Sequence, residues 1–351
     1  AAAALVEGEG LDAPLLLDAL VAHSLVHRRS DGDSLRFGIY QPIRDFAIAQ
    51  SQAGAAAAWR QRLRAWALQW VRSLPRTPPL PLLRAEMPNL LAALHSAVQD
   101  DAPDDAAVLL LALRRGLEDV SLPAEGLELA CTAVERCDDT LLRALGHTLL
   151  APLLFTAGRA EAARHHAELG LGCHALDKLQ RARALHAMAR VRWRSRRQAG
   201  EVEPLIDEAE ALLGESPDDE LRASLLALRA FVVNAHHGDL VRGEALHAQA
   251  LQLWERLGNQ HAIASGRYNL AVCAQNAGRN VECLERLAPV IDSAREQQDW
   301  RRLSQSLNVR GNACSALRQW PQAIRDYQEC IRTAWTDTSS YDLAFGLWNL
   351  P

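Results

Sequence analysis

Two stretches of the chain share one pattern of small and apolar residues. Residues 267–290, RYNLAVCAQNAGRNVECLERLAPV, recur forty residues later as residues 307–330, LNVRGNACSALRQWPQAIRDYQEC. In this alignment Ala271 falls on Gly311 and Cys283 on Ala323. Each stretch predicts two helices joined by a tight turn. Because one such hairpin cannot bury its apolar face alone, the repeat predicts a stack of hairpins, an α-solenoid.

The repeat extends over residues 140–351. Its turns recur at intervals of 42, 38, 40 and 40 residues, at Gly158, Gly200, Gly238, Gly278 and Arg318. This period is longer than the ~34 residues of a minimal tetratricopeptide unit and overlaps the HEAT range. The small residues favour the tetratricopeptide type, because they occupy the positions that this consensus requires: Ala151, Ala271 and Gly311 in first helices, Ala163 and Ala323 in second helices. We therefore expect an all-α, right-handed tetratricopeptide-like superhelix, truncated at its carboxyl end, with longer helices or loops in the units around Gly200 and Gly238.

The amino-terminal residues 1–52 have a different pattern. An apolar helix over residues 14–23 leads into an extended piece at 25–27, a polar turn, an alternating strand at 35–40 and a helix that begins at Pro42. Helix, hairpin, helix is the outline of a partial winged-helix domain. The first helix has no basic or amide side chain that could reach a base edge, so direct DNA binding by this segment is not expected.

Residues 53–139 predict a helical linker region. Trp59, Trp66 and Trp70 recur at helical spacing, and the simplest interpretation of this stripe is a buried core. Prolines over residues 75–81 mark a hinge. Three further amphipathic helices follow, separated near residues 100–105 and 121–124.

The concave face of such a stack is lined by the first helix of each unit, and its outward residues are free to differ from the core pattern. On that face we expect a groove of mostly polar side chains: Tyr268, Gln275, Asn276, Gln305, Asn308, Asn312 and Ser315. Amide side chains can hydrogen-bond the backbone of an extended peptide, so the predicted partner is a peptide or protein segment. Plain solvation of polar helix faces is the alternative.

A second candidate site is basic. Residues 181–197 contain seven arginines and no acid, and the sequence predicts an anionic-ligand patch at Arg190, Arg192, Trp193, Arg194, Arg196 and Arg197. Residues 201–220 then hold nine acids and no base. If both segments form one hairpin, the charges neutralise each other, which is the simpler interpretation.

The sequence gives little support for nucleotide binding, metal binding or catalysis. Lys178 is the only lysine, and no glycine-rich turn precedes it, so the chain has no phosphate-binding loop. GLGCHA at residues 170–175 follows a helix instead of a strand, which argues against a dinucleotide site. The paired histidines at 165–166 and 236–237 lack metal-ligand spacing. No catalytic constellation stands out, so we expect neither an enzyme nor a cofactor or metal in this chain.

The cysteines have no paired spacing, and Cys273, Cys283, Cys314 and Cys330 occupy inward positions of the repeats. This usage indicates a reducing compartment, and the sequence has neither a long apolar run nor a signal pattern. We therefore expect a cytoplasmic location without membrane contact.

The order of these segments resembles the region after the nucleotide-binding module of bacterial STAND signalling ATPases of the AfsR and MalT type. The matching motifs are Ser24-Leu25-Val26, Ile43-Arg44-Asp45-Phe46-Ala47, and the later Glu86, Asn89, Leu90, Ala93 and Leu94. The resemblance implies the regulatory and sensor region of a transcriptional regulator, whose repeats bind an inducer or a protein or peptide partner. It also implies control of an ATPase module, with its ATP and Mg²⁺, that lies outside this chain. Two alternatives stay open: a free-standing tetratricopeptide scaffold or adaptor, and a nucleic-acid-binding module that acts through Arg181 to Arg197.

Overall fold

A computed structural model describes residues 12–31, 34–50, 55–74, 80–112, 114, 124–195, 199–296 and 299–336. The chain divides into two compact units, which we call unit 1 (Ala1–Gln180) and unit 2 (Arg181–Pro351). The predicted boundaries at residues 52 and 139 both fall inside unit 1, and as functional boundaries they stay predictions. Each unit is described by itself.

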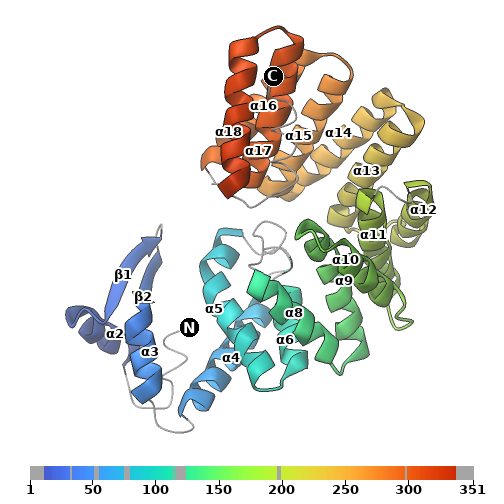
Figure 1. Ribbon diagram of the computed structural model, residues 1–351. Helices are drawn as coiled ribbons and strands as arrows, with labels where there is room; N and C mark the ends of the chain where they lie inside the picture. Colours follow the sequence, from blue (N-terminus) through green and yellow to red (C-terminus); the bar gives the residue numbers. More distant parts are fainter. Residues whose placement is uncertain are drawn as a thin grey trace. The chain divides into compact units, whose positions relative to one another are not determined.

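Unit 1 begins with a helix, a hairpin and a helix, as the local pattern predicts (Figure 1). Asp12 caps the first helix by accepting a hydrogen bond from the Leu15 amide. The strands pair antiparallel in a register that places Val26 opposite Ile39. A winged-helix assignment for this segment stays a prediction. The elements are α2 (Ala13–Ala22), β1 (Val26–Asp31), β2 (Ser34–Ile39) and α3 (Gln41–Gln50).

The linker region is helical, with two departures from the expectation. The tryptophan stripe is not the core of its helix: Trp59 is 37% exposed and Trp66 is half-buried, whereas Ala67 and Leu68 are buried. The proline break is shorter than predicted, because the next helix already starts at Leu80 and includes the last hinge residue; residues 75–79 lie outside the described residues. The helices are α4 (Ala55–Ser73), α5 (Leu80–Gln99), α6 (Pro103–Ala112) and α8 (Ala124–Arg136).

The first repeat hairpin closes unit 1. Helix α9 (Thr140–Thr156) packs along α10 (Ala160–Leu171), and Gly158 makes the turn between them at a φ of 79° that favours glycine. Ala151 and Ala163 are fully buried between the helices, as predicted.

Unit 2 continues the repeat. Consecutive helices from α13 to α18 pack on one another as neighbouring rods (Figure 1). Turns lie at Gly238, Gly278 and Arg318, as predicted, and these three residues have positive φ. Gly200 instead belongs to a short 3-10 helix and has no positive φ. The elements are α11 (Lys178–Ser195), η1 (Ala199–Glu201), α12 (Val202–Leu213), α13 (Asp219–Val232), the π-turn η2 (Val233–His237), α14 (Leu240–Leu257), α15 (Gln260–Asn276), α16 (Asn280–Glu296), α17 (Trp300–Ala316) and α18 (Trp320–Thr336).

Small side chains let these helices approach. A Cβ at Gly311 would lie 2.5 Å from the Tyr327 ring, so that glycine is required where α17 meets α18. Ala271 and Cys283 are fully buried between α15 and α16. The inward cysteines of the repeats, Cys273 and Cys314 among them, are buried and form no disulfide, as expected. The fold is thus a tetratricopeptide-like solenoid.

Burial keeps the Cys283 thiol protonated, because it raises the pKa of this group to about 11. Among the residues that the structure describes, no helix combines the length and the apolar character that a membrane crossing requires.

Candidate functional site

One face of α15 organises the site. Its residues at 265, 268, 269, 272, 273 and 276 are three or four positions apart and therefore lie on one side of the helix. Asn269, Val272, Cys273 and Asn276 line a pocket of about 210 Å³, all within unit 2. Tyr268, one turn earlier, holds an arginine of α17 over its ring. The two halves of this face offer different chemistry.

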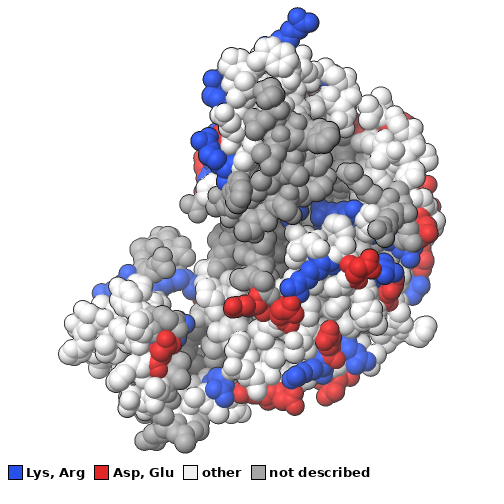
Figure 2. Space-filling model, viewed as in Figure 1, with Lys and Arg blue, Asp and Glu red and all other residues white. Residues whose placement is uncertain are grey.

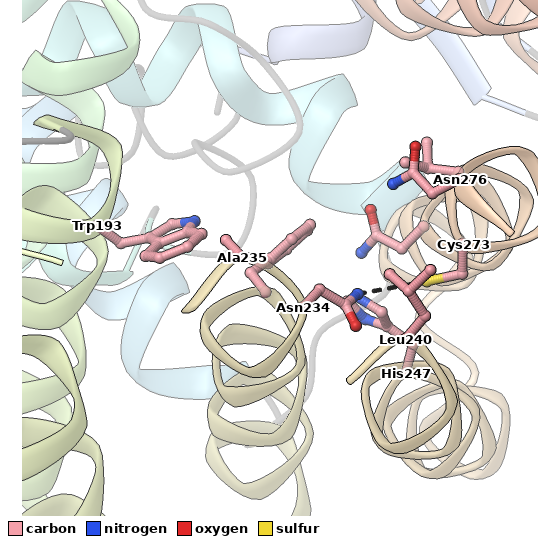
Figure 3. A pocket seen from close by; sticks show the side chains of 10 residues that line it. Trp193, Asn234, Ala235, Leu240, His247, Cys273 and Asn276 are labelled. Carbon is pink, nitrogen blue, oxygen red and sulfur yellow. Dashed lines mark hydrogen bonds between the residues drawn. The ribbon is translucent and has the colours of Figure 1, made fainter. Parts of the chain in front are cut away.

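The pocket collects side chains from five helical elements, α11, α13, η2, α14 and α15 (Figure 3). Trp193 of α11 and Phe231 of α13 contribute aromatic surface, and Leu240 of α14 adds an aliphatic side chain. Three amides, those of Asn234, Asn269 and Asn276, reach the same space. Apolar walls with a few amide groups suit one apolar side chain of a ligand together with the polar backbone beside it.

The position of Asn234 depends on a glycine. Asn234 lies in η2 against α14, where a Cβ at Gly243 would come within 1.7 Å of its Oδ1. Its Nδ2 donates a weak hydrogen bond to Cys273 Sγ at 3.6 Å, which Figure 3 marks. Within the described residues, the buried Oδ1 has no hydrogen-bond partner. This oxygen packs against Gly243, so the free energy that an unpaired buried acceptor costs is a cost of the fold itself.

His247 forms the apolar floor of the pocket. The imidazole is buried and meets the Phe231 ring edge-on, with ring centroids 4.8 Å apart. Burial lowers the pKa of His247 to about 4, so the ring is neutral at physiological pH. The pocket therefore gains no charge from this histidine.

The predicted groove residues are only partly brought together. Asn276 lines the pocket, and Tyr268 lies on the same face of α15. Gln275, which precedes Asn276 in the sequence, is half-buried. Asn312 is engaged inside its own hairpin, where its Oδ1 accepts a hydrogen bond from the Tyr327 hydroxyl at 2.9 Å. The pocket does not include the α17 residues of the predicted groove, and their role stays a prediction: Gln305, Asn308, Asn312 and Ser315.

The predicted anionic-ligand patch divides into two parts. Arg192 forms an ion pair with Glu201 at 2.9 Å, and Arg181 forms one with Glu208 at 3.2 Å. In these two pairs the acidic segment 201–220 neutralises the arginine charge, as the simpler interpretation of the sequence expects. On the face shown in Figure 2, acidic and basic side chains likewise lie next to each other. Trp193 instead lines the pocket. The pKa of Arg194 is lowered to about 10, first by burial and then by the charges of Arg190, Arg301 and Arg302. Arg190 contributes positive charge near Arg194.

Arg196 and Arg197 lie outside the described residues. The two histidine pairs behave differently from one another. His166 is buried and shares a hydrogen bond with His147, with 3.0 Å between the two Nδ1 atoms. Its imidazole is therefore not hydrated by solvent. His237 is exposed and contacts Glu203. In the described ranges, no group of three histidine, cysteine or acidic side chains is placed to hold a metal ion.

The sequence interpretation missed Phe231, Asn234 and Asn269. Asn234 carries a signal that could have revealed it. Counted from the turn residue, it occupies the position that Ala274 and Cys314 occupy in later units, both buried and small. A polar amide at a core position of a repeat is the informative exception.

Neither a protein-family model nor a curated protein matches the sequence. Solved structures do resemble it. The aspartyl phosphate phosphatase F of Bacillus subtilis is 11% identical over 94% of this chain and 82% of that chain, with a TM-score of 0.56. A Rap protein complexed with Competence and Sporulation Factor is 12% identical over 88% and 89%, with a TM-score of 0.51.

A further likeness is to a STAND protein with a tetratricopeptide repeat sensor from Pyrococcus horikoshii. It is 12% identical over 99% of this chain and 58% of that chain, with a TM-score of 0.44. At these identities the first two likenesses show the fold alone, and the last one is too distant to carry an argument. The geometry and the first two likenesses together show a helical-repeat fold of the tetratricopeptide-like type.

Proposed function

We propose that this chain is the regulatory and sensor region of a STAND-type signalling ATPase, and that its solenoid binds a peptide or protein segment. The observation that carries the binding part is the pocket on α15, where Trp193 and Phe231 meet the amides of Asn234, Asn269 and Asn276. Rings can take an apolar side chain, and amides can pair with an extended backbone. A protein of this fold that is complexed with Competence and Sporulation Factor gives a precedent for ligand recognition.

Regulation requires differential binding. A ligand shifts the solenoid toward an active arrangement only if it binds that arrangement more tightly than the resting one. The ATPase link rests on the order of sequence motifs from Ser24 to Leu94, typical of STAND proteins. In that scheme the amino-terminal helices transmit the change to the ATPase module.

Binding is tested with a pool of random nonapeptides and immobilised protein, with captured peptides sequenced by mass spectrometry. Trp193→Ala should reduce capture about tenfold, since a large ring contact is lost. The matched control is Trp320→Ala, whose ring is 55% exposed on α18 and outside the pocket. Equal capture by both variants would place binding elsewhere, and no capture by the wild type would remove the proposal.

The ATPase link is tested on the longer gene product. We expect an upstream Walker A lysine loop and ATP hydrolysis that changes when a captured peptide is added. A gene product without such a loop would leave the alternative, a free-standing tetratricopeptide scaffold or adaptor, as the better assignment.

A further inference from the structure

The end of α13 contains one residue more than the corresponding part of α15. The turn glycines Gly238 and Gly278 are forty residues apart, so by sequence Phe231 corresponds to Ala271, which is fully buried. In the structure Ala230 is fully buried instead, and Phe231 is 36% exposed. The residues before the turn are therefore shifted by one position relative to the next repeat.

The rest of the burial pattern shows the same shift. Val232 and Val233 are buried, and they match the buried Cys273 and Ala274 at a spacing of 41 residues instead of 40. The π-turn η2 accommodates the extra residue, because its wider turn takes up one residue more than an α-helical turn. Such insertions are frequent at functional sites, and two residues of η2, Asn234 and Ala235, line the α15 pocket.

The shift turns Phe231 out of the core and into the pocket. By burial it now corresponds to Val272 of α15, and both side chains line the same space. The ring meets His247 edge-on, and more than a third of the residue stays exposed. An aromatic ring that lines a pocket in this way can contact a further ring of a ligand.

The free space suits one six-membered ring. Its volume is about 210 Å³, and an apolar protein cavity of about 150 Å³ already holds a benzene molecule. Trp193 stands on one side of the pocket and Asn276 on the other (Figure 3). No charged side chain is among the described residues that line it, so a charged ligand group would lose hydration without gaining an ion pair.

We infer that the α15 pocket is a subsite for one phenylalanine or tyrosine ring of the bound peptide, and that the extra residue at η2 creates it by turning Phe231 outward. This inference rests on the proposed function and adds the class of side chain that the ligand carries. Phe231 and Trp193 offer edge-to-face or offset contacts, which favour a ring over an aliphatic side chain of similar area. Asn269 and Asn276 can pair with the peptide backbone beside the ring.

The test starts from the best peptide of the random nonapeptide capture. Each of its apolar positions is replaced in turn by phenylalanine, tyrosine, leucine or glutamate, and the Kd of each labelled peptide is measured by fluorescence anisotropy. At one position, wild-type protein should bind the phenylalanine and tyrosine peptides about three to ten times more tightly than the leucine peptide, as ring–ring contacts imply. The glutamate peptide should bind most weakly.

Two variants test the rings of the pocket. Phe231→Leu changes a part-exposed side chain, so it should fold, and it should bind the ring and leucine peptides with equal affinity. Trp193→Leu should reduce the same preference. The matched control is Phe46→Leu, on α3 in unit 1, where the phenylalanine is 66% exposed and outside the pocket; it should keep the full preference.

Equal binding of ring and leucine peptides by the wild type would overturn the inference and leave the proposed function intact. A ring preference that Phe231→Leu and Trp193→Leu both retain would also overturn it, because the ring would then bind elsewhere. No peptide capture by the wild type would end both proposals.

Discussion

At the scale of single residues, the contact between Asn234 and Gly243 is the most sensitive point of the site. The asparagine amide occupies the volume that any side chain at 243 would need. Both residues come from neighbouring helical elements of one repeat, η2 and α14. The orientation of the amide in the pocket therefore depends on the absence of one methyl group.

Gly243→Ala should displace Asn234, lower the free energy of unfolding by about 1–3 kcal/mol and weaken peptide capture. Adding Asn234→Ala removes the overlap, so the double variant should recover most of the stability but not the capture. Gly200→Ala is the matched control, since no atom lies within 4 Å of the added Cβ and the change should be neutral or slightly stabilising. Urea denaturation measures all four proteins; full stability in Gly243→Ala would contradict the close packing.

Buried histidines predict a dependence of stability on pH. Burial lowers the pKa of His147 and of His247 to about 4, and also lowers that of His166. The unfolded chain takes up a proton near pH 6.5, whereas these folded imidazoles stay neutral. Their contribution is therefore fully present above about pH 6.5 and is lost as the pH falls toward 4.

Between pH 7 and pH 5 the free energy of unfolding should drop by about 1–2 kcal/mol for His147 and by a similar amount for His247. The carboxyl groups with lowered pKa, Asp104 and Glu244, lose their contributions only at lower pH. Urea midpoints at the two pH values measure the drop. A ring NMR signal assigned to His147 or His247 that titrates near pH 6.5 in the folded protein would disprove the explanation.

At the scale of the element, the α17–α18 hairpin contains the best-defined buried ion pair. Arg310 donates to Asp326 through Nε at 2.8 Å and Nη2 at 2.6 Å, and Gln322 donates to the same carboxylate at 2.7 Å. The Asp326 side chain is 1% exposed. Removing one partner leaves the other charge without its hydrogen bonds inside the hairpin.

Asp326→Asn should therefore lower the free energy of unfolding by about 3 kcal/mol. The control, Glu329→Gln, breaks the more exposed pair with Arg295 and should cost less than about 1 kcal/mol. Thermal unfolding followed by circular dichroism measures both. Equal losses of unfolding free energy in the two variants would mean that burial does not determine how much each ion pair contributes to stability.

Sequence alone predicted the hairpins well, because helix packing imposes a strict pattern: Ala271 and Cys283 must be small and apolar wherever they recur. The sequence did not predict which outward-facing residues of different helices contact one another. Trp193 of α11 lines the α15 pocket through tertiary packing, which no local pattern encodes. Asn312 shows the converse, since its hydrogen bond with Tyr327 depends on side-chain direction within one hairpin. The tryptophan stripe of α4 was likewise misread, because size alone does not decide burial.

At the scale of the whole molecule, unit 2 is a chain of nearest-neighbour contacts. Each of α14 to α17 packs chiefly on the helix before it and the helix after it. In such stacks, stability is approximately the sum of the stabilities of the repeats and of their interfaces. A substitution that destabilises one hairpin should therefore leave the stability of distant hairpins in unit 2 unchanged.

Hydrogen exchange on Asp326→Asn checks this expectation. Amides of α17 and α18 should exchange at least about tenfold faster than in the wild type, in line with the lost stability. Amides of α13 and α14 should keep their protection. Faster exchange throughout unit 2 would indicate one cooperative block instead of an array.

Lys178 is a single, natural attachment site for an amine-reactive reporter group. It is the only lysine in the sequence, its side chain is exposed, and it opens α11 two residues before the end of unit 1. An amine-reactive fluorophore would thus label one side chain at the junction of the two units, apart from the chain terminus. Its emission polarisation could follow rearrangement at that junction while the native cysteines stay in place.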